Sequence, residues 1–131
     1  MPLLVSSGMG DLPGDVCRAV LQFQEALNRK DTAAMQRLLT PDTIFENTYP
    51  PPDGSRYAGR EAVMAFWLEF FEASKEASFE LEEIFAAGER CVLRWVYRWV
   101  GKDGTHGHLR GVDVFRLREG LIAEKLSYVK G

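Results

Sequence analysis

The sequence of 131 residues has few of the features that mark specialised classes of protein. Its only two cysteines, Cys17 and Cys91, fall in apolar patterns without metal-binding or redox spacing, so we expect buried free thiols. There is no apolar run of membrane-spanning length, and the start lacks the basic and apolar regions of a signal peptide. The net charge of −3 gives no reason to expect nucleic acid or an anionic membrane as a partner. We therefore expect a cytoplasmic protein.

The composition and length are those of one globular domain. Hydrophobic residues make up 46% and charged residues 27% of the chain, which is ordinary for a folded protein. Residues 1–14, rich in glycine, serine and proline, are predicted to form a flexible N-terminal arm. Residues 15–131 then form a single domain, of a length that supports one hydrophobic core.

Hydrophobic periodicity predicts mainly helices in the N-terminal half of the chain and strands in the C-terminal half. Residues 15–30 and 31–40 are predicted helices, with Asp31 as N-cap of the second, and residues 43–49 a short strand. Residues 61–73 carry a strong helical apolar stripe. The period then changes to two in four segments, 79–87, 91–101, 106–117 and 121–129. This order predicts an α+β fold in which three N-terminal helices pack on a curved mixed or antiparallel sheet.

Turn signals predict which side chains of the sheet face one another. A two-residue turn at Asp103-Gly104 puts Arg94 opposite Asp113, and a three-residue loop at 118–120 puts Asp113 opposite Lys125. Two cations beside this carboxylate would favour its ionised form. The group is either a structural ion network or a charge kept in an apolar strand for a function, and the pattern leaves both open.

The same register puts a row of aromatic side chains, Trp95, Tyr97 and Trp99, on the face opposite Asp113. Large aromatic side chains on an outer face need a covering surface. The alternative is that the faces are reversed, so that these aromatics line a pocket and Arg94 lies outside. His106 and His108 share one strand face beside the turn, and we expect solvent-exposed histidines there rather than a metal site.

Three stretches resemble the NTF2-like superfamily, particularly its SnoaL-like polyketide cyclase, ketosteroid isomerase and limonene epoxide hydrolase branches. They are the segments 28–47, 57–63 with its Gly59-Arg60-Glu61-Ala62 motif, and 111–125. The resemblance implies an NTF2-like cone of helices and sheet that encloses a small-molecule pocket. It also implies a homodimer through the outer sheet face, here carrying Trp95, Tyr97 and Trp99.

The resemblance carries over only part of the known active sites. Where ketosteroid isomerases have a tyrosine, a base aspartate and an oxyanion-hole aspartate, this sequence has Phe23, Asn47 and Asp113. Asn47 also matches the epoxide hydrolases, but Arg98 and Ser127 stand at the positions of their two aspartates. Neither reaction is therefore expected. SnoaL-like cyclases need one acid/base aspartate in an apolar cavity, and Asp113 matches it.

We expect a cofactor-independent isomerase or cyclase acting on a small apolar carbonyl compound, with Asp113 as acid/base and Arg94 and Lys125 stabilising an enolate. One alternative is a non-catalytic ligand-binding or dimeric scaffold domain, in which these three residues form a structural network. Another is a carboxylate receptor built on Arg94, Arg98 and Lys125. No metal or cofactor is expected. The residues expected to line the site are Phe23, Asn47, Tyr49, Phe66, Trp67, Phe70, Val96, Arg98, Phe115 and Ser127.

Overall fold

The computed structural model describes residues 14–74 and 76–130, so the predicted arm lies outside the described residues except for Gly14. Three helices and six strands follow one another as α1 (Gly14–Asn28), α2 (Thr32–Arg37), β1 (Leu39–Glu46), β2 (Arg56–Ala58), α3 (Arg60–Ala73), β3 (Ala77–Ala87), β4 (Arg90–Val100), β5 (His106–Arg118) and β6 (Leu121–Val129). The predicted α+β class is confirmed. Among the described helices, none is long and apolar enough to cross a membrane.

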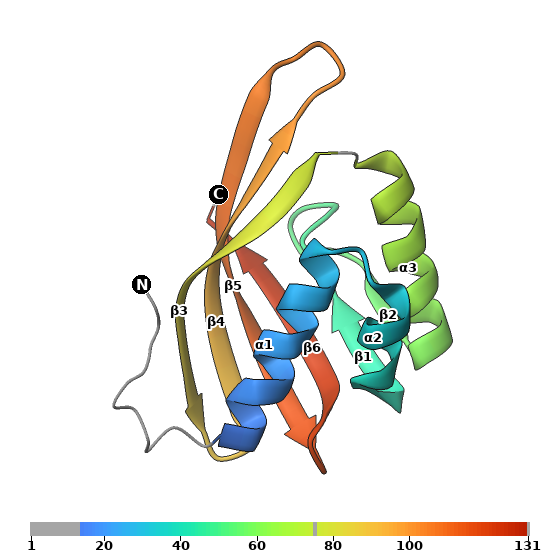
Figure 1. Cartoon of the computed structure of the whole chain (residues 1–131), viewed down its shortest axis with the longest axis vertical. Helices are drawn as coiled ribbons and strands as arrows, with labels where there is room; N and C mark the ends of the chain where they lie inside the picture. Colours follow the sequence, from blue (N-terminus) through green and yellow to red (C-terminus); the bar gives the residue numbers. More distant parts are fainter. Residues whose placement is uncertain (1–13, 75, 131) are drawn as a thin grey trace.

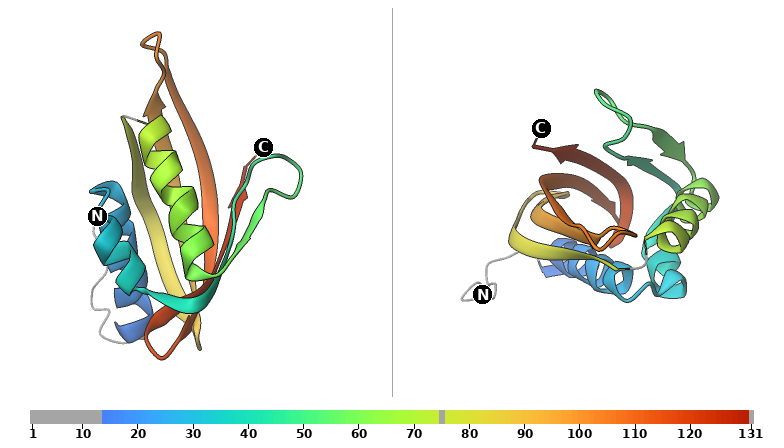
Figure 2. Two further views of the ribbon diagram at one scale, coloured as in Figure 1. Left: turned by 90° about the vertical axis from the view of Figure 1, so that its right-hand side faces the viewer. Right: turned by 90° about the horizontal axis from the view of Figure 1, so that it is seen from above.

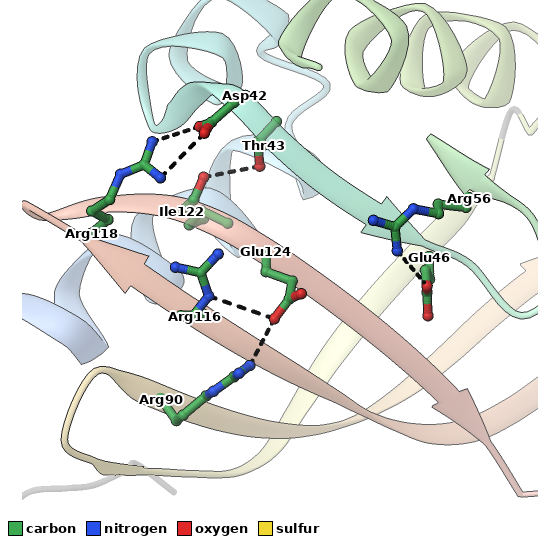
Figure 3. Close-up of polar contacts among 9 residues, drawn as sticks. All are labelled: Asp42, Thr43, Glu46, Arg56, Arg90, Arg116, Arg118, Ile122 and Glu124. Carbon is green, nitrogen blue, oxygen red and sulfur yellow. Dashed lines mark hydrogen bonds and ion pairs between the residues drawn. The ribbon is translucent and has the colours of Figure 1, made fainter. Parts of the chain in front are cut away.

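All six strands belong to one sheet, in the order β2-β1-β6-β5-β4-β3. The last four form the predicted antiparallel meander, whereas β1 runs parallel to β6, so the sheet is mixed. Two side-chain contacts join β1 to the C-terminal strands (Figure 3). Thr43 Oγ1 donates a hydrogen bond to the carbonyl oxygen of Ile122 in β6 over 2.9 Å, and Asp42 forms an ion pair with Arg118 of β5 at 2.5 Å. On β6, Glu124 forms an ion pair with Arg90 of β4 at 2.8 Å.

The sheet curves strongly and the helices lie on its concave side, while the β4–β5 hairpin projects beyond them (Figures 1 and 2). The core between the layers contains the fully buried side chains of Phe23, Met35, Leu93 and Phe115. Asp31 caps α2 as predicted, because its Oδ1 accepts a hydrogen bond from the backbone N–H of Ala34 over 3.1 Å.

The first strand begins four residues earlier than predicted. The preceding helix was expected to run to residue 40, but β1 already begins at Leu39 and includes Pro41. The pairing of β1 with β6 is irregular between Leu39 and Ile44, and such a break in the ladder accommodates a residue without a backbone N–H. β2, of only three residues, was not predicted, since it is too short to show a period.

The two hairpin turns differ in length from the prediction: the first has three residues instead of two, and the second has two instead of three. Gly101 N–H bonds the carbonyl oxygen of Thr105 over 2.7 Å, which closes a three-residue loop that ends at Gly104 with φ +84°. The next turn has two residues, Glu119 at φ 54° and Gly120 at φ 79°. Both registers therefore differ from the prediction, and the predicted pairing of Arg94 with Asp113 is wrong.

Arg94 lies opposite Val112, and Asp113 lies between Leu93 and Ser127. Because side chains alternate along a strand, the shift of one residue exchanges the two faces of β4. Arg94 is on the outer face, where it pairs with Glu83 at 3.2 Å.

The reversed arrangement of faces, stated above as the alternative, is thus the correct one. Trp95 is only 5% exposed and packs in the core, and Tyr97 packs against the same core. Trp99 stacks on Tyr97 at 5.4 Å between ring centroids. The sequence had predicted that these three side chains form an outer dimer face, and this prediction is wrong because they lie on the inner face.

Candidate ligand-binding site

A pocket of about 270 Å³ opens between α3 and the concave face of the sheet. Residues from α3, from strands β1 and β3 to β6 and from the loop after β1 line this pocket, and most of them are aromatic. They are Phe45, Asn47, Thr48, Tyr49, Phe66, Trp67, Phe70, Phe79, Trp95, Tyr97, Leu109, Lys125 and Ser127. The helix supplies one wall, and the strands together with the loop after β1 supply the others.

The aromatic walls form one connected set of ring contacts. On the helix side, Phe45 of β1 stacks on Trp67 of α3 with centroids 5.4 Å apart. On the sheet side, Phe79 stacks on Tyr97 at 4.7 Å and meets Trp95 edge-on at 5.6 Å. Phe70 joins the two sides through Tyr97 at 5.9 Å. Packed rings of this kind give a rigid apolar surface that suits a flat ligand.

Polar groups meet at the β6 side of the pocket, where Lys125 is almost fully buried. Its Nζ lies 3.2 Å from Asp113 Oδ2 and donates a hydrogen bond to Ser127 Oγ over 3.1 Å. Ser127 Oγ in turn donates to Asp113 Oδ1 over 2.6 Å. The ammonium also sits 4.4 Å from the centre of the Phe45 ring and 5.4 Å from that of Trp67. Ion pairing, hydrogen bonding and cation–π contact thus compensate for burying the charge.

Asp113 itself does not line the pocket. It is 3% exposed, and the pocket wall next to it is made by Lys125 and Ser127. The carboxylate can therefore act on a bound molecule only through these two side chains. The predicted pairing of Asp113 with Lys125 is confirmed as an ion pair, although Ser127 and not Lys125 is its direct partner across the strands.

The pocket brings together seven of the predicted site residues and leaves out six. Phe23 and Phe115 are fully buried in the core without reaching the pocket. Val96 and Arg98 alternate with Trp95 and Tyr97, so they lie on the other face, where Arg98 pairs with Glu80 at 2.8 Å. A carboxylate receptor that combines Arg94 and Arg98 with Lys125 is therefore not formed. The predicted residues that do line the pocket are Asn47, Tyr49, Phe66, Trp67, Phe70, Lys125 and Ser127.

The sequence prediction missed most of the sheet side of the pocket, apart from Lys125 and Ser127, and one overlooked pattern would have found it. Trp95 lies directly opposite Gly111, and Trp99 opposite Gly107. A Cβ atom at Gly111 would come within 2.6 Å of the Trp95 ring, so each indole covers a position that only glycine leaves open. Matching two tryptophans to two glycines gives the observed register. Trp95 and Tyr97 were placed in a pocket only by the alternative with reversed faces, and the lining residues absent from both predictions are Phe45, Thr48, Phe79 and Leu109.

Asn47 shapes the mouth of the pocket. Its Oδ1 accepts hydrogen bonds from the backbone N–H of Ser55 over 2.8 Å and from that of Tyr49 over 3.3 Å. Both bonds hold the proline-rich loop, in which Tyr49 is 74% exposed. The amide oxygen is thereby engaged by the protein itself.

The part of the chain that the structure describes holds no group of three or more histidine, cysteine, aspartate or glutamate side chains placed to bind a metal ion. His106 and His108 are exposed on the β4–β5 hairpin. Cys17 and Cys91 are buried free thiols, as predicted.

Helices packed on a curved mixed sheet around an apolar pocket define an NTF2-like protein. Residues 20–125 match the model of the SnoaL-like domain, and the chain belongs to that family. No curated protein matches the sequence.

Solved structures agree with this assignment. An NTF2-like protein from Mesorhizobium loti is 36% identical, with 89% of this chain and 92% of that chain covered at a TM-score of 0.76. A Mycobacterium tuberculosis protein in complex with estradiol-17β-hemisuccinate is 23% identical (87% and 92% covered, TM-score 0.75). A putative polyketide cyclase from Sinorhizobium meliloti is also 23% identical (90% and 96% covered, TM-score 0.71). The last two share the fold.

Proposed function

We propose that this protein binds a small, flat, mostly apolar carbonyl compound in the pocket between α3 and the sheet. The observation that carries the proposal is a buried ammonium, that of Lys125, in the wall of a mostly aromatic pocket. The volume of about 270 Å³ is close to the lower end, roughly 300 Å³, of pockets that hold small molecules. The rings would contact the flat apolar surface, and the ammonium would donate a hydrogen bond to the carbonyl oxygen.

The ligand of one protein with the same fold supports this class of compound. The Mycobacterium tuberculosis protein was solved with estradiol-17β-hemisuccinate, a steroid ester with an extended apolar surface. The Sinorhizobium meliloti protein is described as a putative polyketide cyclase. An aromatic pocket with one polar end suits the same kind of molecule.

Binding is tested by isothermal titration calorimetry with 2-tetralone, a compact bicyclic ketone. We expect saturable binding at one site, weakened at least about tenfold by Trp67→Ala, which removes a wall of the pocket and the ring beside Lys125. The matched control is Arg56→Met, which removes an exposed ion pair with Glu46 away from the pocket. Absence of binding by folded wild-type protein to this and related ketones would refute the proposal.

Cofactor-independent isomerisation or cyclisation is a second candidate function, favoured by the 2.6 Å hydrogen bond from Ser127 to Asp113. In this scheme a proton leaves the carbon next to the bound carbonyl and passes to Ser127 Oγ, while the hydroxyl proton of Ser127 passes to Asp113. The enolate oxygen accepts a hydrogen bond from Lys125. Reversal of the transfers at another carbon completes an isomerisation. Asp113 is thus the acid/base through Ser127, and Arg94 takes no part.

Enolisation is measured without knowing the natural substrate, as exchange of the α-protons of 2-tetralone in deuterated water followed by NMR. We expect exchange above the buffer rate, and its loss in Asp113→Asn and Ser127→Ala, with Arg56→Met unchanged. Binding without enhanced exchange would reject catalysis and leave the ligand-binding alternative, in which Lys125, Ser127 and Asp113 only hold the pocket wall.

We also propose that the protein is cytoplasmic and forms a homodimer. Two buried free thiols fit a reducing compartment. The outer sheet face keeps exposed Phe85 (48%) and Tyr128 (55%), which a second copy would cover. Sedimentation velocity of wild type and Tyr128→Glu tests the dimer: a monomeric wild type would reject it.

A further inference from the structure

The charged group of the pocket that is still free to bind a ligand is a hydrogen-bond donor. Lys125 has three N–H groups, and Asp113 and Ser127 engage two of them. The third N–H is left for a bound molecule, and Lys125 lines the pocket. The indole Nε1 atoms of Trp67 and Trp95 are fully buried and offer no donor to the pocket.

Carboxylate acceptors, by contrast, are lacking among the described lining residues, and two of the neutral acceptors, those of Asn47 and Ser127, are already used. Asn47 Oδ1 accepts two backbone N–H groups of the loop. Ser127 Oγ accepts from Lys125 and gives its own hydrogen to Asp113. No aspartate or glutamate lines this pocket in the described chain. A ligand that brings a donor to this end would find no carboxylate to receive it.

The order of the charges also favours an acceptor. Lys125 lines the pocket whereas Asp113 lies behind it, so the positive end of the pair is nearer to a bound molecule. In a low-dielectric site the nearer charge dominates the local field. A ligand oxygen is therefore the group that would accept the third N–H of Lys125.

We propose that this pocket selects ligands whose inner end carries an oxygen acceptor, that oxyanions such as a carboxylate bind more tightly than a neutral ketone, and that Lys125 is the donor. This inference rests on the proposed binding function and adds the polarity of the ligand. It also reverses the chemistry expected from an exposed Asp113, which would favour ligands that donate hydrogen bonds.

The test is calorimetry with three naphthalenes of one shape that differ in a single substituent: 2-naphthoate, 2-acetylnaphthalene and 2-(aminomethyl)naphthalene, at pH 7. We expect affinity to fall in that order, by at least about tenfold between the carboxylate and the amine. Equal affinities, or preference for the amine, would overturn the inference while leaving the pocket as a binding site. If none of the three binds, the proposed function fails as well.

The donor is tested separately through Lys125→Met, which keeps the aliphatic stem and removes the ammonium. The variant should weaken naphthoate binding at least about tenfold without weakening amine binding. Arg56→Met is the matched control, since its exposed ion pair with Glu46 lies away from the pocket. Equal losses for both ligands would mean that only packing was removed.

Discussion

Replacing Lys125 by methionine tests the buried polar group on which both functional proposals depend. The side chains of Lys125 and Asp113 are 9% and 4% exposed, and their charged atoms are 3.2 Å apart. At an effective dielectric constant of about 20, the Coulomb attraction at this distance is about 5 kcal/mol. Methionine keeps the aliphatic stem in place between Phe45 and Trp67 but leaves the carboxylate with Ser127 as its only remaining side-chain partner among those described.

We therefore expect Lys125→Met to lower the free energy of unfolding by about 3–5 kcal/mol, the usual cost of stranding one member of a buried pair. The double variant Lys125→Met/Asp113→Leu should recover to within about 1 kcal/mol of wild type, because both charges are then gone. The control is Arg56→Met. Its pair with Glu46 is shorter, at 3.0 Å, but the side chains are 60% and 36% exposed, so we expect a loss below about 0.5 kcal/mol.

Urea unfolding followed by far-ultraviolet circular dichroism gives all these values, with Asp113→Leu completing the cycle. The prediction depends on burial and not on distance, since the shorter pair is expected to matter less. A Lys125→Met loss no larger than that of the control would refute it, and so would a double variant as unstable as the single one. The first result would mean that water reaches the ion pair, and the argument for a polar anchor in a dry pocket would fail. The second would mean that lost packing, and not a stranded charge, causes the instability.

Three further predictions concern other parts of the fold. Gly111→Ala should lower the free energy of unfolding, measured in urea, by about 3 kcal/mol or more, because the new Cβ would lie 2.4 Å from the backbone carbonyl oxygen of Tyr128. A loss below about 1 kcal/mol would contradict the register of β5 and β6. Arg118 lowers the pKa of Asp42 from 3.8 to about 2, so the ion pair stabilises the protein above pH 4 and this stabilisation is lost as the pH falls to about 2. In Arg118→Met, NMR titration should show the pKa of Asp42 returning towards 3.8. An unchanged pKa would reject the pairing. Burial raises the pKa of the Cys17 and Cys91 thiols, so both should resist Ellman's reagent at pH 8 until the protein is unfolded; rapid reaction of the native protein would show that they are accessible.

Local patterns predicted the elements of the fold well, because each pattern reports burial of one face. The apolar stripe of residues 61–73 became α3, Arg60–Ala73, and four segments of period two became β3 to β6. The failures lie where no period exists. β2 has three residues, and Pro41 in β1 is tolerated only because the ladder is irregular there.

The candidate site was predicted only in part, because it depends on register rather than on periodicity. An aspartate followed by glycine fits a two-residue turn, and it fits equally the end of a three-residue loop with glycine in the left-handed region. The choice was wrong at Asp103-Gly104 and wrong in the opposite sense at Glu119-Gly120. The helix wall, which depends on the period alone, was found through Phe66, Trp67 and Phe70.

The same shift of one residue decides what chemistry the pocket can offer. With Arg94 opposite Asp113, the carboxylate would have been an open acceptor flanked by two cations. In the structure Arg94 points away, and Ser127 and Lys125 separate Asp113 from the cavity. A bound molecule therefore meets an ammonium and a hydroxyl first, and the carboxylate acts by holding both in place. Identical residues in the predicted register would favour proton abstraction by direct contact, whereas in the observed register they favour recognition of an oxygen atom, with any proton transfer passing through Ser127.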